Sequence, residues 1–287
     1  LWNLFLGRRS VCYPFSDYCD PLVKNREDLI SLVSCLGESV GDFELRTYHP
    51  GSALEGTHAD DSFSNYSISL QDEPAILYSC LHSSCIQRKI KKSEKSGVKI
   101  REGNGLSDLK PFYRLHLKTR QRLGLPSQPF LFFRKLWENF GDSGEMKLLF
   151  AEYEGSKIGC LVLIGYRSAA APSGGGDVLY YKYGASDARY FRLGFSPALF
   201  WKAILLAKDQ GYSCFDLGRV SDIDEISLGI FKRHLGAEKK PLLYFSTSKV
   251  YSESGKSRAV VLAGKCLRIA PSWVSGMAGR MFYRYLG

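Results

Sequence analysis

The sequence predicts an α/β fold, an α+β arrangement around a mixed sheet, that divides into two lobes. Strand-like and helix-like patterns alternate along the 287 residues, which is typical of helices layered on a sheet. A β-hairpin is expected over 146–166, and a strand–helix–strand unit follows it at 178–217, so antiparallel and parallel pairs should share one sheet. A break near residues 97–106 is where we expect the two lobes to meet.

The predicted elements before that break are mostly short. They are a strand or hairpin at 4–13, a helix at 27–36, a strand at 43–46, a polar loop at 49–64 and a strand at 65–70. The exception is a long helix expected from Asp72 to about Ser96. Its second half is strongly basic, and Gly97 ends it.

The region after the break alternates helices with strands. Its predicted elements are a strand at 98–101, helices at 106–123 and 130–140, the hairpin, a strand at 178–183, a helix at 198–208 and strands at 212–217 and 242–247. Gly194, Ser196 and Pro197 break the chain before the helix at 198–208. A helix start offers unpaired N–H groups and the positive end of a dipole, so Gly194 and Ser196 are predicted to seat a phosphate or a polarised carbonyl. The alternative is that these residues serve turn geometry alone.

The composition indicates the charge of the binding partner but not its chemical class. The net charge of +10 predicts an anionic partner, which could be a nucleotide, RNA, a phospholipid surface or a phosphorylated substrate. The eight cysteines show no CxxC pair and no Cys/His metal spacing, so we expect a reduced, cytoplasmic protein with no metal and no disulfide framework. No apolar run approaches the roughly 20 residues that span a bilayer. Because Leu1 opens inside an apolar segment, we expect a truncated N-terminus.

Seven short motifs, in a fixed order, carry a resemblance to a known family. They are YPFSDY at 13–18, ELR at 44–46, IKKSEKSGV at 90–98, RQRLGLP at 120–126, YKYGAS at 181–186, FDLGR at 215–219 and FKRHLGA at 231–237. Through them the chain resembles the FemAB-like branch of the GNAT acyltransferase superfamily over nearly its whole length. The resemblance implies tandem GNAT-like lobes, the first truncated at its N-terminus. We expect 1–97 to complete the first lobe, 98–250 to form the second, acyltransferase lobe, and 251–287 to form a basic, aromatic tail.

The resemblance also implies a reaction. An acyl or aminoacyl group would pass from an activated donor to an amine of a cell-envelope or polysaccharide-linked substrate. Direct transfer is expected, because no Ser/His/Asp or Cys/His set is apparent for a covalent intermediate. No tightly bound cofactor is expected, and the donor is a co-substrate: acyl-CoA, acyl carrier protein or aminoacyl-tRNA. The chain has no counterpart of the long two-helix tRNA arm of some bridge enzymes, and 191–196 only approximates the pyrophosphate loop of CoA-using members.

The site residues follow from the resemblance and from the charge that develops during acyl transfer. Lys232, the lysine of the FK motif, is predicted to stabilise the oxyanion. Asp17 is the candidate general base, although substrate-assisted proton transfer would need none. The predicted substrate-binding residues are Tyr181, Tyr183, Arg120, Arg122 and Arg219. Gly194 and Ser196 are the cofactor-binding candidates.

Each assignment has a structural alternative. Lys232 could be a solvated helix lysine and Tyr183 a core residue. Arg120 and Arg122 could form a solvated helix end, and Arg219 could simply pair with Asp216. The expected partners are an anionic small-molecule or lipid-linked substrate, with tRNA, acyl carrier protein or the inner face of the membrane as further options. The tail could contact a membrane or pack on the second lobe. Two other functions stay open: a non-catalytic binder of a phosphorylated glycan or lipid precursor, and an RNA-binding module.

Overall fold

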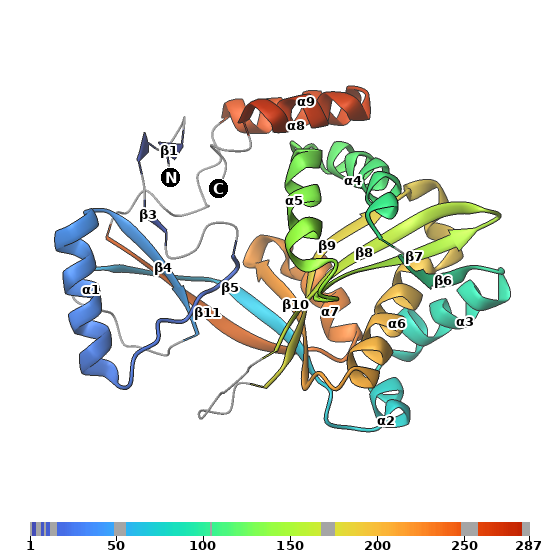
Figure 1. The fold of residues 1–287 in the computed structure, drawn as a ribbon, viewed down its shortest axis with the longest axis horizontal. Helices are drawn as coiled ribbons and strands as arrows, with labels where there is room; N and C mark the ends of the chain where they lie inside the picture. The colour runs from blue at the N-terminus through green and yellow to red at the C-terminus, as the bar shows by residue number, and fades with distance from the viewer. Residues whose placement is uncertain are drawn as a thin grey trace.

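The computed structural model describes residues 2–3, 7–8, 10–11, 16–48, 56–103, 105–167, 176–247 and 258–282 (Figure 1). Its helices are α1 (Arg26–Val40), α2 (Pro74–Ser79), α3 (Arg88–Lys95), α4 (Leu109–Leu123), α5 (Phe130–Phe140), α6 (Phe195–Asp209), α7 (Ile230–His234), α8 (Arg258–Ile269) and α9 (Ser272–Phe282). Shorter helical turns are η1 (Ser83–Gln87), η2 (Leu106–Asp108), η3 (Ala188–Leu193), η4 (Asp222–Asp224) and η5 (Glu225–Gly229).

The strands form one large mixed sheet and one small sheet. They are β1 (Trp2–Asn3), β2 (Gly7–Arg8), β3 (Ser10–Val11), β4 (Phe43–Thr47), β5 (His58–Ser69), β6 (Lys99–Glu102), β7 (Met146–Tyr153), β8 (Ser156–Tyr166), β9 (Val178–Ser186), β10 (Cys214–Ser221) and β11 (Glu238–Ser246). The large sheet has the order β3-β4-β11-β5-β10-β9-β8-β7-β6, and β1 pairs with β2. Within it, β3–β4 and β9–β10 are parallel and the other pairs are antiparallel. The predicted α/β class with a mixed sheet is confirmed.

Strand β5 comes from the N-terminal part of the chain and lies between β10 and β11. The sheet therefore continues across the predicted boundary at residue 97, with strands from both sides of it paired. The division into 1–97, 98–250 and 251–287 stays a prediction. The continuity matters for function, because residues of β5 and of the segment before α1 reach strand β10.

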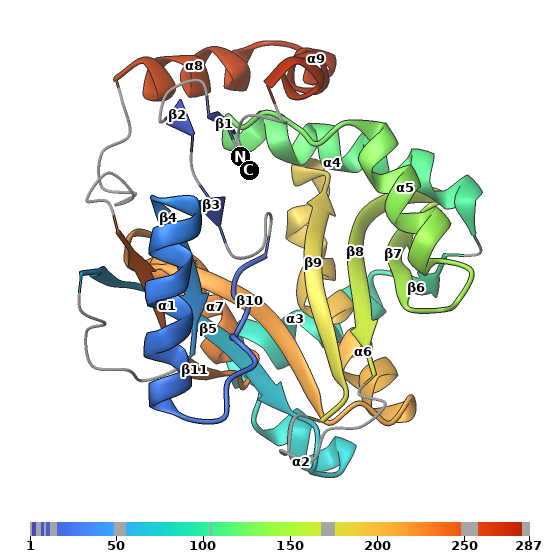
Figure 2. The ribbon, with the colours of Figure 1, turned by 60° about the vertical axis from the view of Figure 1, so that its left-hand side comes forward.

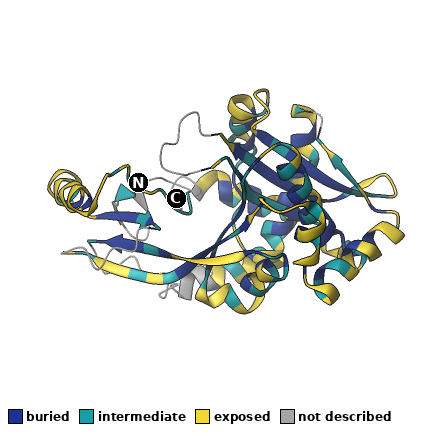
Figure 3. Ribbon diagram, turned by 90° about the horizontal axis from the view of Figure 1, so that it is seen from below, coloured by how far each residue is buried: buried dark blue, intermediate teal, exposed yellow. Residues whose placement is uncertain are grey.

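Helices cover both faces of the sheet (Figure 2). Helix α6, with α3 packed beside it, builds the largest core on one face, and α4 and α5 build a second core on the other. Alternate residues of β7 show the two faces: Leu149 and Ala151 join the first core, whereas Leu148 and Phe150 join the second. Figure 3 shows buried residues along the central strands and exposed residues on the outer sides of the helices.

The C-terminal helices pack on the second lobe, one of the two arrangements left open for the tail. Both α8 and α9 contact α4. Ser275 ties α9 to the segment after α4, because its carbonyl accepts from the Ser127 N–H at 3.0 Å and its hydroxyl donates to the Leu125 carbonyl at 2.7 Å. The aromatic residues Tyr283 and Tyr285 of the tail lie outside the described residues. No helix in the described ranges is long and apolar enough to cross a membrane.

Two predicted elements differ from the structure. The long helix expected over 72–96 is divided into α2, the π-helical turn η1 and α3, because the His82 side chain accepts from the Cys85 N–H and starts a new helical segment. The polar loop expected over 49–64 contains the start of β5, where His58 pairs with Ser246 of β11. This part of β5 is a strand because its backbone pairs with β11. Its side chains are polar, so the sequence pattern did not predict a strand there. Much of the strand expected over 4–13 lies outside the described residues.

Candidate active site where two strands part

The candidate site lies where the parallel strands β9 and β10 separate. Their pairing runs from Val178 and Cys214 to Tyr180 and Asp216, and Figure 2 shows the two strands diverging beyond that end. Each strand carries a bulge just past the last pair. In β9, Lys182 is the extra residue opposite β8, and β10 has a register shift against β5 after Asp216. Bulges redirect side chains and interrupt pairing, so the opening is built into both strands.

Asp17 lies at this opening between cations from both strands. Its carboxylate is 3.6 Å from Arg219 Nε on β10 and 3.9 Å from Lys182 Nζ on β9. It also lies close above the backbone of Gly218, where an added Cβ would come within 3.1 Å of Asp17 Oδ2. The Tyr244 hydroxyl donates to the Asp17 carbonyl at 2.7 Å and accepts from Arg219 Nη1 at 3.0 Å. The structure thus brings together the predicted Asp17 and Arg219, from opposite ends of the chain.

Lys232 lies beneath the same turn of β10. Its ammonium donates to the carbonyls of Gly218 at 2.8 Å and Arg219 at 3.1 Å, and the residue is only 3% exposed. The Tyr66 ring lies 5.6 Å from Nζ. Burial lowers the pKa of Lys232 to about 8, and the nearby carboxylate of Asp17 offsets part of that fall. The predicted oxyanion-stabilising lysine is therefore a buried cation fixed to the strand end that also carries Arg219.

Among the described contacts, Asp216 is held by residues other than Arg219, the structural partner that we considered from the sequence. Its carboxylate accepts from Tyr18 Oη and Asn65 Nδ2, each at 2.9 Å, and from the Gly218 N–H at 2.6 Å. These donors come from three segments and hold Gly218 in its left-handed conformation, with φ of 76°. Burial raises the pKa of Asp216. The buried Asp216 side chain therefore fixes the β10 turn, and the contacts of Arg219 include Asp17 and Tyr244.

The two tyrosines predicted to bind substrate point to opposite faces of the sheet. Because Lys182 is the bulge residue, the alternation of side chains reverses between Tyr181 and Tyr183. Tyr181 packs edge-on against Phe200 of α6, and its burial raises its pKa to about 12. Tyr183 packs against Phe133 of α5, at 5.1 Å between ring centroids. Both tyrosines are half-buried, so neither is free of the core.

Arg120 and Arg122 do not converge on one point. They are two residues apart on α4, which places them about 200° apart around the helix. Arg120 Nε donates to the Pro126 carbonyl at 2.9 Å and ties down the turn after the helix. Arg122 lies over the Phe191 ring and lines a pocket of about 390 Å³. That pocket is lined by Lys118, Gln121, Arg122, Ser186, Asp187, Ala188 and Arg189.

The predicted phosphate seat at the start of α6 is closely covered. Gly194 has the expected left-handed conformation, with φ of +75°, but an added Cβ would lie 2.7 Å from the carbonyl of Lys89 on α3. Gly194 is buried, Phe195 and Pro197 are buried beside it, and Ser196 is half-buried. The close approach of α3 leaves no room for a side chain at position 194, so packing as well as turn geometry requires a glycine there. This helix start resembles a packed junction more than an open anion site.

Sequence reasoning missed several residues of the site. Tyr18 and Lys182 lie within quoted motifs, so their position beside predicted residues was a usable signal. Asn65 and Tyr244 had no local signal, because only the pairing of β5 and β11 with the central strands brings them to β10.

Comparisons with known proteins give the family and the fold of the chain. The sequence model described as acetyltransferase (GNAT) domain matches residues 83–232. A UDP-N-acetylmuramoylpentapeptide-lysine N(6)-alanyltransferase from Weissella viridescens is 26% identical over 167 residues, which cover 57% of this chain and 46% of the relative. The chain thus spans about half the length of that relative. The crystal structure of FemX has a TM-score of 0.59 at 12% identity, covering 78% of this chain and 77% of that one, and supports the fold alone. The predicted FemAB-like resemblance is confirmed, and the chain belongs to the GNAT acetyltransferase domain family.

Proposed function

We propose that this chain transfers an aminoacyl group from an activated ester to an amine of a peptidoglycan precursor. The observation that carries the proposal is the cluster of Asp17, Lys182, Arg219 and Lys232 where β9 and β10 part. Family membership supports acyl transfer, and the name of the Weissella relative suggests a lysine amine of a UDP-linked muropeptide as the acceptor.

Lys232 has the chemistry to stabilise the transition state. Attack of an amine on an ester places negative charge on the carbonyl oxygen, and a fixed donor aimed at that oxygen lowers the barrier. An ammonium has three protons, and in the described part of the chain two of them have carbonyl acceptors. The third is available to a substrate oxygen that reaches the strand end. Because the lysine is fixed by two backbone carbonyls, little reorganisation is needed.

Asp17 is the carboxylate that an incoming amine would meet. The other central carboxylate, Asp216, already accepts three hydrogen bonds and is 3% exposed, whereas the side chain of Asp17 is 31% exposed. We propose that Asp17 binds the acceptor ammonium and takes a proton from it. Lys182 and Arg219, on either side of Asp17, would then hold the carboxylate or phosphate groups of the acceptor.

The packing at the start of α6 argues against one of the three donors, acyl-CoA, and the charge of α3 favours another. A CoA thioester that placed its pyrophosphate at Gly194 would meet a buried glycine against which the Lys89 carbonyl of α3 already packs. An aminoacyl-tRNA has no such requirement, and its phosphates would suit the basic residues of α3. We therefore propose aminoacyl-tRNA as the donor, with the nucleic acid near Arg88, Lys91 and Lys92.

The test is transfer itself. The purified chain is incubated with UDP-N-acetylmuramoyl-pentapeptide containing lysine and with alanyl-tRNA, acetyl-CoA or an acyl carrier protein thioester, and the acceptor mass is followed. A mass increase of one alanine with the tRNA donor alone is the expected result. Acetylation from acetyl-CoA would overturn the donor proposal. Binding of the muropeptide without any product would indicate the non-catalytic binder, and salt-sensitive tRNA binding without transfer would indicate the RNA-binding module.

A further inference from the structure

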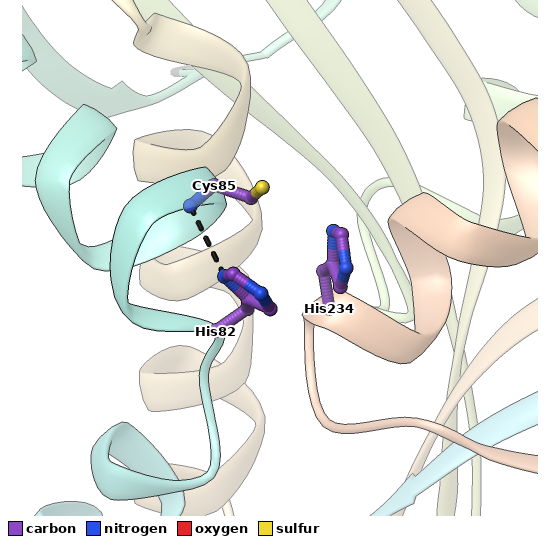
Figure 4. Close-up of side chains that lie close together, drawn as sticks. All are labelled: His82, Cys85 and His234. Carbon is purple, nitrogen blue, oxygen red and sulfur yellow. Dashed lines mark hydrogen bonds between the residues drawn. The ribbon is translucent and has the colours of Figure 1, made fainter.

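Three side chains of metal-binding type lie together outside the site described above. His82, Cys85 and His234 each present one ligand atom, and these atoms lie within 4.8 Å of one another (Figure 4). Within the described ranges, no second group of three histidine, cysteine or acidic side chains is arranged so closely. His82-x-x-Cys85 is a short half-site spacing, so the sequence-based statement that the chain has no Cys/His metal spacing was wrong at this position. His234 is 149 residues further along the chain than Cys85, too distant for any spacing rule.

The backbone already holds the two segments of this cluster together. The His82 N–H donates to the His234 carbonyl at 2.9 Å, and the two imidazole rings lie 4.2 Å apart between centroids. His82 is the N-cap residue of the π-helical turn η1, and Cys85 lies within that turn. Such turns are rare and often mark functional positions. Figure 4 shows the Cys85 sulfur projecting from η1 toward the side of His234.

We propose that His82, Cys85 and His234 bind one Zn²⁺ ion, with water as the fourth ligand. Imidazole nitrogen and thiolate sulfur are the ligands that Zn²⁺ prefers, and three protein ligands plus water complete its tetrahedral shell. His82 is exposed, so solvent can reach the open position. The ligand atoms must approach by up to about 1.5 Å from their present separations, which are at most 4.8 Å, since donor atoms on a tetrahedral zinc lie roughly 3.3–3.8 Å apart.

The proton balance of binding is simple. Cys85 gives up its thiol proton to solvent, no atom is oxidised or reduced, and the thiolate offsets one charge of the ion. His82 Nδ1 now accepts a 3.3 Å bond from the Cys85 N–H. Ligation through Nε2 moves the ring proton to Nδ1, where Ser84 Oγ at 3.4 Å is the nearest acceptor.

The ion would join η1 to α7, the helix that carries Lys232. His234 is the last residue of α7 and follows Lys232 by two positions. A metal bond at His234 would limit the motion of this one-turn helix and so hold the Lys232 ammonium under the β10 turn. The proposed zinc is therefore a support for the active site at a distance from the reacting atoms.

The experiment measures metal binding directly. The chain is stripped with a chelator, dialysed against Zn²⁺, and its metal content is counted per chain; Co²⁺ is then substituted as a spectroscopic probe. We expect one ion per chain and a thiolate-to-Co²⁺ absorption band. Cys85→Ser and His234→Gln should each weaken binding by more than about 100-fold, because even loss of an outer partner costs about 10–100-fold. Cys35→Ser on α1 and His58→Gln on β5 are the matched controls and should leave affinity unchanged.

Three results would overturn the proposal: no saturable zinc binding by the wild-type chain, a Co²⁺ complex without the thiolate band, or equal losses in the control variants. The melting temperatures of the metal-free proteins show whether a variant has failed to fold. If one has, the spectrum of the wild-type Co²⁺ complex still decides the question. Because the readout is metal content, its failure is independent of any failure to observe acyl transfer.

Discussion

Replacing Lys232 by methionine removes a buried cation and keeps an unbranched side chain of similar length. The variant loses the donor to the Gly218 and Arg219 carbonyls and the proton available to a substrate oxygen. Removing one donor from an oxyanion site costs about 10²–10³ in kcat. We expect a loss of that size in kcat for the proposed transfer, with a much smaller change in KM. Lys202→Met, on the exposed side of α6, is the matched control and should leave both constants unchanged.

The same lysine predicts opposite effects of pH on activity and on stability. Its pKa in the folded chain is about 8, lowered by burial from 10.5. The protonated form stabilises the oxyanion, so activity should fall as pH rises through about 8. Between pH 8 and 10.5 the folded chain has released this proton while the unfolded chain still binds it, so stability should rise with pH. From pH 7 to pH 10 the gain attributable to this group is about 2–3 kcal/mol.

The stability assay is denaturant unfolding of wild type and Lys232→Met at pH 7, 8, 9 and 10. Subtracting the variant removes the contribution of every other titrating group. The difference in free energy of unfolding should move in favour of wild type as pH rises, while single-turnover transfer by wild type declines. A difference that stays flat across this range would show that Lys232 is not a strained buried cation. Unchanged kcat in the variant would refute its role in transfer.

Two further substitutions test the packing and the electrostatics around the site. Gly194→Ala should destabilise the chain by about 1–2 kcal/mol more than Gly97→Ala, because both glycines have positive φ but only Gly194 lies against the Lys89 carbonyl. Denaturant unfolding of both variants measures the difference, and equal losses would contradict the close packing. Asp187→Asn should lower the free energy of unfolding by about 1 kcal/mol at pH 7, because the Arg189 guanidinium lowers the pKa of the Asp187 carboxyl. This cost should disappear as the pH falls below about 4, where first the unfolded and then the folded carboxyl becomes protonated. A pH-independent difference would exclude the ion pair as its cause.

The sequence was sufficient for the fold class and for the neighbourhood of the site, and insufficient for side-chain direction. The YKYGAS motif marked β9 correctly, but a strand pattern alone places Tyr181 and Tyr183 on one face. The bulge at Lys182 reverses that, and it arises from pairing with β8 across the sheet. Side chains two residues apart on a helix point in nearly opposite directions, so they cannot bind one group together. The predicted helix at 106–123 therefore already argued against a shared ligand for Arg120 and Arg122.

Strand β5 explains why the remaining site residues could not be read from local patterns. It supplies Asn65 to Asp216 and the Tyr66 ring to Lys232, and it pairs with β10 directly beside the bulge at Gly218. These contacts join residues more than 150 positions apart, and no periodicity within either segment encodes them. They also show that the region matched by the family, 83–232, does not hold the site by itself. The turn that positions Lys232 is completed by strands and loops that precede residue 83, so the N-terminal part of the chain is a structural component of the proposed active site.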